Sequence, residues 1–410
     1  MTARFALPAF AGYGIELEYM IVDRRSLAVR PIADQLLRAL AGHDTAEVER
    51  GTLGWSNELV RHVVEVKNIV PTPSLVELPA RFHDEIRAAN ERLAAVDARL
   101  MPTAMHPWMD PATDTVLWED AGEIYRTYHR IYDCCGHGWS NLQSMHVNLP
   151  FAGDAEFERL HAAIRLVLPL VPALAASSPF EDGISKGFLD RRLENYRTIC
   201  TRTPSVSGRV IPETSHSRAD YEARVLAPMY AEIAALDPAG VLQHEWLNSR
   251  GAIARFDRDA IEIRLVDVQE CPQADLAIAA LLVATVRALY RESSSSLADQ
   301  QAIATETLYD TLLATMRDGD DGIVDDAAYL RTLGVSGESL RAGDLWRQLV
   351  DASGDGTIGA WWRPAIDMIL SRGPLARRIL RATGSDADRD RLRAVYRELC
   401  DCLAEGRMFA

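Results

Sequence analysis

The first strongly patterned segment of the chain alternates between apolar and acidic side chains. Residues 14–23 read Gly-Ile-Glu-Leu-Glu-Tyr-Met-Ile-Val-Asp, with apolar residues at positions 15, 17, 19 and 21. This period of two predicts a strand that holds Glu16 and Glu18 on one face, about 7 Å apart. Two such carboxylates repel each other unless a positive charge lies between them, and a divalent cation would supply it. A strand whose glutamates simply face water is the alternative.

Later segments repeat this polar stripe with an apolar back. Residues 59–70, 140–151 and 260–267 are each predicted to be strands, and a turn at 257–259 joins the last of them to a strand at 252–256. Their polar positions are Glu65, Ser144, His146, Asn148, Glu262 and Arg264. If these strands form one antiparallel sheet backed by helices, all these side chains line one concave face.

Helical patterns and turn signals fill the segments between these strands. Ser74 and Glu77 have the spacing of a capping box, which predicts a helix from there to about Leu100. Pro169 and Pro172 should break the second half of another helix. The further predicted elements are helices at 31–40, 119–134, 154–176 and 218–236, a turn at 51–57 and a strand at 101–106.

The C-terminal part of the chain has a different character. Residues 276–290 are apolar almost all round, which predicts a helix buried in the core. Beyond Gln273 the pattern is nearly all helical. We therefore expect an α+β domain at residues 1–295 and a helical C-terminal region at 296–410 packed on the same domain.

Composition limits the classes of partner and compartment. The 410-residue chain has 44 basic and 59 acidic residues and a net charge of −15, which argues against nucleic acids and anionic membranes as partners. Residues 1–10 lack the apolar run of a secretion signal, and the apolar segment at 276–286 is too short to span a bilayer. We expect a soluble, cytoplasmic protein. Its six cysteines lack zinc-site spacing, which favours reduced structural thiols over a redox-active Cys134-Cys135 pair.

The ionisable residues of the predicted strands form a set suited to hard metal ions. Five carboxylates and one imidazole are the mixture expected for Mg²⁺ or Mn²⁺ rather than structural zinc. Several carboxylates around two or more ions would suit phosphoryl transfer from a nucleotide. Arg264 would stabilise charge on the phosphate, with an ion pair to a neighbouring glutamate as its alternative. The candidate ligands are Glu16, Glu18, Glu58, Glu65, His146 and Glu262.

A local excess of basic residues lies at residues 189–213. The segment contains Arg191, Arg192, Arg197, Arg202 and Arg209. In an acidic protein this excess indicates either an anion-binding loop or a solvated loop whose arginines pair with surface acids.

Several short motifs, taken in order, resemble glutamate–cysteine ligase family 2, which includes the YbdK-type carboxylate-amine ligases. Each motif alone has low specificity, and the resemblance depends on their order over roughly residues 12–295. In the third motif, Ser-Met-His-Val-Asn stands where many members have His-Val-His-Val-Gly. The motifs are Gly14–Glu18, Glu58–Lys67, Gln143–Asn148, Ala176–Phe180, Asn195–Arg197 and Glu262–Asp267.

The resemblance implies a glutamine-synthetase-like fold, in which a curved antiparallel sheet forms a funnel backed by helices. It also implies ATP- and Mg²⁺-dependent (or Mn²⁺-dependent) joining of a small-molecule carboxylate to an amine through an acyl phosphate, in a protein that can form a homo-oligomer. The six candidate ligands above then become metal ligands. Arg264 becomes a catalytic phosphate contact, Arg264 and Glu16 contact the nucleotide, and Arg197 becomes a substrate-loop arginine.

Two other interpretations of the same residues remain open. A metal-dependent hydrolase or phosphatase would use the same ligands to activate water. A family member that binds nucleotide or amino acid without turnover is the second.

Overall fold

The centre of the molecule is an eight-stranded sheet. The computed structural model describes residues 6–118, 122–352 and 360–410. Its sheet has the order β2-β3-β4-β1-β6-β10-β9, with β5 paired to the far end of β1, and every pairing is antiparallel. The strands are β1 (Gly14–Asp23), β2 (Glu47–Arg50), β3 (Leu53–Asn57), β4 (Val63–Asn68), β5 (Ala98–Met101), β6 (Ser144–Pro150), β9 (Ala252–Arg255) and β10 (Ala260–Asp267).

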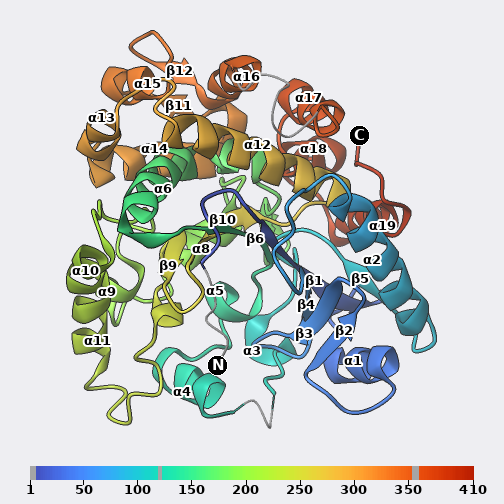
Figure 1. Ribbon diagram of the computed structural model, residues 1–410. Helices are drawn as coiled ribbons and strands as arrows, with labels where there is room; N and C mark the ends of the chain where they lie inside the picture. The colour runs from blue at the N-terminus through green and yellow to red at the C-terminus, as the bar shows by residue number, and fades with distance from the viewer. Residues whose placement is uncertain (1–5, 119–121, 353–359) are drawn as a thin grey trace.

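The apolar face of this sheet packs against three long helices. Ile15 and Leu17 of β1 and Val147 of β6 are fully buried in the same core as Phe82 of α2 and Phe157 of α6. Helix α12 crosses this layer and contacts both α2 and α6 (Figure 1). The alternation seen in the sequence therefore divides the sheet into an apolar face and a polar face. The helices are α2 (Leu78–Ala94), α6 (Gly153–Val167) and α12 (Pro272–Tyr290).

Shorter helices surround the sheet and connect its strands. Those before residue 295 are α1 (Ala33–Ala41), α3 (Pro111–Asp114), α4 (Gly122–Tyr132), α5 (His137–Ser140), α7 (Pro172–Ala175), α8 (Arg191–Tyr196), α9 (Pro204–Ser207), α10 (Arg218–Tyr221) and α11 (Ala227–Ile233). A two-stranded ribbon of β7 (Phe180–Glu181) and β8 (Ile184–Ser185) precedes α8.

The C-terminal region shares the core of the sheet domain. Trp346 of α16 is fully buried and donates its indole N–H to the carbonyl of Leu170 at 2.8 Å. Helix α19 contacts α2 and β5, and α17 contacts α12. The region comprises α13 (Leu297–Ala302), α14 (Thr305–Asp318), α15 (Ala327–Thr332), α16 (Ala342–Ala352), α17 (Arg363–Arg372), α18 (Leu375–Thr383), α19 (Arg389–Glu405) and the short pair β11 (Ile323–Val324) and β12 (Leu340–Arg341).

Helix α12 is longer than the apolar segment at 276–286 suggested. At 19 residues it is the one helix in the described part of the chain that is long and apolar enough to cross a membrane. However, 72% of its apolar window is buried inside the protein, as the all-round apolar pattern predicts for a core helix.

Three local predictions are wrong. The turn expected at 51–57 is confined to Gly51 and Thr52, because Trp55 packs in the core and makes the rest a strand. The capping box does not form: α2 begins at Leu78, and the hydroxyl of Ser74 accepts the amide of Val76 at 3.3 Å in a local turn. The strand expected at 101–106 is β5, which ends at residue 101 because its pairing with β1 ends there.

The proline break and the buried thiols agree with expectation. Helix α6 ends at Val167, and a 3₁₀ turn at Leu168–Leu170 separates it from α7. Residues 119–121 of the helix predicted at 119–134 lie outside the described residues. All six cysteines are free, and burial raises the pKa of Cys134 to about 12, which disfavours a reactive thiolate.

Candidate active site

The register of four neighbouring strands builds a cluster of carboxylates around one histidine. Glu16 on β1 lies opposite His146 on β6, and Glu18 lies opposite Glu65 on β4. Glu262 extends from β10, on the other side of β6. Side chains at opposed positions share a face, so residues far apart in the sequence meet on the polar side of the sheet. Glu18, Glu65 and Glu262 are 8%, 5% and 3% exposed, which excludes a simple solvated strand face.

His146 is the shared member of two potential metal sites. Its Nδ1 lies 3.1 Å from Glu16 Oε2 and 3.7 Å from Glu262 Oε1, and its Nε2 lies 3.8 Å from Glu18 Oε1. One group is Glu16, His146 and Glu262, and the other is Glu18, Glu65 and His146. In each group the potential ligand atoms lie within 4.8 Å of one another.

Strand β6 holds both β1 glutamates from the side. The backbone amide and hydroxyl of Ser144 donate to Glu18 Oε2 at 2.7 and 3.1 Å, and the side-chain amide of Asn148 donates to Glu16 Oε1 at 3.0 Å. In both glutamates one oxygen is thus held by β6 while the other faces His146. Ser144 and Asn148 are two of the three positions, with Met145, at which this chain departs from the motif common in the family it resembles.

The cluster carries more carboxylate than its own cations neutralise. Burial would raise the pKa of Glu16, but the hydrogen bond and charge of His146 hold it well below its ordinary value. Burial opposes protonation of His146, yet the hydrogen bond to Glu16 and the surrounding carboxylates raise its pKa to about 9. Burial and the charge of Glu16 raise the pKa of Glu65 to about 7. Burial and the charges of Glu18 and Glu65 raise the pKa of Glu58 well above its usual range.

Arg264 lies in a β-bulge at the edge of this cluster. The pairing of β10 with β6 shifts between residues 263 and 266. Two residues of β10, Arg264 and Leu265, therefore lie opposite the single residue His146 of β6. A bulge of this kind changes the direction of a side chain and often lies next to an active site. The backbone amide of Arg264 donates to the carbonyl of Gly251 at 2.8 Å, which anchors the bulge from the β9 side.

Two arginines contact Glu262. Arg264 Nε donates to Glu262 Oε1 at 2.6 Å, and Arg255 of β9 lies 3.3 Å from Glu262 Oε2. The ion pair weighed as the alternative for Arg264 is therefore present in this structure. Arg255 is a residue that sequence reasoning missed. Its signal was available, because Ile253 pairs with Glu262 and the period of two puts Arg255 on the same face.

A buried ion pair holds the bulge from behind. Arg192 of α8 is 2% exposed and donates its Nε to Asp267 at 2.5 Å. Its Nη1 and Nη2 lie 3.5 and 3.4 Å from the carbonyl oxygen of Arg264. Asp267 also accepts from the amide of Ser177 and the hydroxyl of Ser178 at 2.8 and 2.9 Å. The motifs at 176–180 and 262–267 thus meet in one clamp under Arg264.

Arg197 lies apart from the carboxylate cluster. It pairs with Glu194 at 2.6 Å, and its Nη1 lies 3.4 Å from the hydroxyl of Tyr309. The hydroxyl of its neighbour Tyr196 interacts with Arg264. The other arginines of segment 189–213 also have protein partners, although these are not the surface acids of the pairing alternative: Arg191 contacts the buried Glu181, Arg202 the carbonyl of Ile131, and Arg209 the ring of Tyr309.

The cluster fits hard divalent ions. Its donors are carboxylate oxygens with one imidazole, and their mutual distances allow two ions to share His146. The upward pKa shifts of Glu58 and Glu65 arise from burial and from repulsion between the carboxylates, and bound cations would offset both. The positive side chains of Lys67, Arg255 and Arg264 border the carboxylates, as binding of a phosphate would require.

Comparison with known proteins agrees with the resemblance seen in the motifs. The family model described as Glutamate-cysteine ligase family 2 matches residues 13–398. An uncharacterized protein of Archaeoglobus fulgidus is 34% identical over 310 residues, which cover 75% of this chain and 80% of that one. A putative glutamate–cysteine ligase 2 of Bradyrhizobium diazoefficiens is 29% identical over 72% of this chain and 64% of its own length. Another, from Rubrobacter xylanophilus, is matched over 47% of its length, so this chain spans only part of its named relatives.

A solved structure shows the same fold. Glutamate–cysteine ligase of Francisella tularensis, crystallised in complex with AMP, superposes with a TM-score of 0.61 at 12% identity, covering 98% of this chain and 90% of that one. This likeness shows a glutamine-synthetase-like fold that extends through the C-terminal helices. With the family model covering nearly the whole chain, this protein belongs to glutamate–cysteine ligase family 2, a family of carbon–nitrogen ligases.

Proposed function

We propose that this protein is an ATP- and Mg²⁺-dependent carboxylate–amine ligase that forms an amide bond through an acyl phosphate. The observation that carries the proposal is the pair of ligand groups sharing His146 on one polar sheet face. Two hard-ion sites less than 5 Å across, bordered by arginines, suit a triphosphate whose oxygens need neutralisation. The AMP bound to the Francisella tularensis enzyme supports a nucleotide as the ligand of this fold.

The roles of the residues follow from their positions. Bound divalent ions would neutralise the phosphate oxygens and hold them for in-line transfer. Glu16, Glu18, Glu65, His146 and Glu262 are the ligands proposed to hold these ions, and Glu16 also borders the nucleotide. Glu58, in the loop between β3 and β4, belongs to neither group of ligand atoms and is proposed to complete the ligand set when ions bind.

Arg264 is proposed to stabilise charge on the transferred phosphate. A divalent ion held by Glu262 would weaken the ion pair between Glu262 and Arg264, and the guanidinium would then be free to contact the phosphate. Arg197 remains the proposed substrate-loop arginine. The polar face of the curved sheet would then form the floor of the funnel, with residues 1–295 as the catalytic part and 296–410 as its helical support.

The substrates are proposed to be a small carboxylic acid and an amine, handled by a cytoplasmic enzyme that can form a homo-oligomer. One assay tests the proposal: phosphate release from ATP with Mg²⁺, measured against a panel of amino acids and amines. We expect release that depends on both an acid and an amine. Hydrolysis of a phosphoester without an amine would indicate a hydrolase, and saturable nucleotide binding without turnover would indicate a non-catalytic family member.

A further inference from the structure

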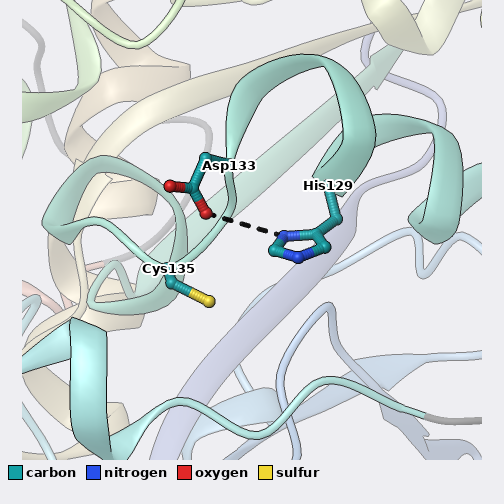
Figure 2. Close-up of side chains that lie close together, drawn as sticks. All are labelled: His129, Asp133 and Cys135. Atoms are coloured by element: carbon teal, nitrogen blue, oxygen red, sulfur yellow. Dashed lines mark ion pairs between the residues drawn. The ribbon is translucent and has the colours of Figure 1, made fainter.

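A separate group of potential metal ligands lies at the C-terminal end of α4. His129, Asp133 and Cys135 each place one ligand atom within 4.8 Å of the others. Figure 2 shows the imidazole, carboxylate and thiol directed toward one small space. We propose that these three side chains bind a borderline transition ion such as Zn²⁺, independently of the hard-ion site on the sheet.

The local backbone explains how three residues so close in sequence converge. Helix α4 ends at Tyr132, and Asp133 adopts a left-handed conformation with φ of 52° while its amide donates to the carbonyl of His129 at 2.9 Å. Aspartate tolerates this conformation better than most residues, and a residue in this conformation ends a helix by reversing the chain. The reversal carries Cys135 back beside the last helical turn, next to the ring of His129.

Metal binding at His129 would replace one long hydrogen bond. The backbone amide of Cys134 donates to Nδ1 of His129 at 3.2 Å, so this nitrogen is unprotonated, and its lone pair would turn to an ion in place of the amide. Asp133 Oδ1 lies 3.9 Å from the same Nδ1, which is too far for a hydrogen bond. Both atoms lie within reach of one ion with bonds of about 2.0–2.2 Å to nitrogen and oxygen.

The ligand types select the ion. A thiolate with an imidazole favours Zn²⁺ or a neighbouring transition metal, whereas an all-oxygen set favours Mg²⁺. Three protein ligands leave a fourth position for water or an external ligand. The side chains of His129 and Asp133 are 43% and 86% exposed, so an ion can enter from solvent. Cysteine spacing alone did not reveal the site, because each of its ligands is a different residue type.

In a third cluster of potential ligands, protein cations already neutralise the carboxylates. His137, Glu181 and Asp182 also approach within 4.8 Å, but Lys186 pairs with both carboxylates and Arg191 pairs with Glu181 at 2.9 Å. These cations fill the place that a metal would take. By contrast, the structure describes no lysine or arginine in an ion pair with Asp133.

Cobalt provides a direct probe of the site. The full-length protein would be titrated with Co²⁺ under reducing, oxygen-free conditions, with excess Mg²⁺ to occupy the hard-ion site. We expect one Co²⁺ per chain with the near-ultraviolet charge-transfer absorption of a thiolate–cobalt bond, displaced by Zn²⁺. Cys135→Ser should abolish this absorption, and His129→Gln or Asp133→Asn should weaken Co²⁺ binding about tenfold or more.

Matched variants keep the test independent of the ligase proposal. Cys134→Ser removes the adjacent thiol and should leave the absorption unchanged, as should Glu18→Ala in the sheet site. Absence of the band in the wild-type protein, or its persistence in Cys135→Ser, would overturn the proposal. Circular dichroism shows whether each variant folds. Should Cys135→Ser not fold, unchanged Co²⁺ affinity in His129→Gln would equally overturn the proposal.

Discussion

The sheet cluster around His146 and the ribbon cluster around Glu181 contain similar residues but differ in how charge is balanced. Around Glu181, Lys186, Arg191 and Asn195 all donate to one carboxylate. Burial would raise the pKa of Glu181, but these donors lower it to about 2. Around His146, the pKa of Glu65 instead rises to about 7. Buried carboxylates that are neutralised by protein cations form a structural network. Buried carboxylates with too few protein cations around them are a candidate ion site.

The largest expected effect follows from removing a ligand in the unbalanced cluster. Glu18→Ala should lower ATP turnover by about 10³-fold, because one of the two proposed ion sites loses a carboxylate. Its melting temperature without divalent ions should change little, since relief of the repulsion with Glu58 offsets the loss of the hydrogen bonds from Ser144. Glu49→Ala, an exposed glutamate on β2 of the same sheet, is the control. Wild-type ATP turnover in Glu18→Ala would contradict the proposal that Glu18 is a metal ligand.

Substitution of Arg264 distinguishes a phosphate contact from a purely structural ion pair with Glu262. Arg264→Ala should lower kcat by about 10²-fold if the guanidinium stabilises charge in the transition state. Steady-state kinetics at saturating ATP and Mg²⁺ would measure this, with Arg255→Ala as the matched loss of a Glu262 partner. A fall in melting temperature with unchanged kcat would mean that Arg264 is only a structural ion-pair partner, as Arg191 is in the cluster around Glu181.

A smaller effect is expected from the clamp behind the bulge. Arg192→Lys keeps the charge but cannot hold Asp267 and the carbonyl of Arg264 together, so kcat should fall about tenfold. If Arg192 acts only by positioning Arg264, Arg192→Lys should lower kcat little further in a protein that already carries Arg264→Ala. Arg191→Lys, which alters the adjacent arginine in the balanced cluster, should leave kcat unchanged. Additive losses in the double variant would exclude the positioning role.

Much of the sheet site was predictable because period-two alternation assigns faces without knowledge of the fold. Glu16, Glu18, Glu65, His146 and Glu262 meet as that rule implied once their strands are paired. The order of the strands was not predictable from periodicity, since it depends on pairings between residues far apart in the sequence, such as Glu18 with Glu65 and Glu16 with His146, and a period of two carries no information about partners.

The features that the sequence did not predict depend on an irregular backbone or on which acid an arginine pairs with. The bulge at Arg264 depends on how β10 pairs with β6, and a strand pattern alone gives no sign of it. The arginine-rich segment was ambiguous because each guanidinium could face an anion or a protein acid. Arg191 and Arg192 are neighbours in sequence, yet one pairs with Glu181 and the other with Asp267. Only the three-dimensional position of the acids separates these roles.

The balanced cluster should show the converse of the ligand variants, with no effect on turnover. Glu181→Gln leaves Arg191 without its carboxylate and Lys186 paired with Asp182 alone, which should lower the free energy of unfolding by about 1–3 kcal/mol at neutral pH. Because the folded pKa of Glu181 lies below its ordinary value, this stabilisation is present above about pH 4.5 and is lost as pH falls toward 2. Urea unfolding at pH 7 and pH 3 would therefore show the difference between wild type and Glu181→Gln shrinking in acid. An equal difference at both pH values, or a loss of turnover in the folded variant, would mean that Glu181 belongs with the ion site and that charge balance does not distinguish the two clusters.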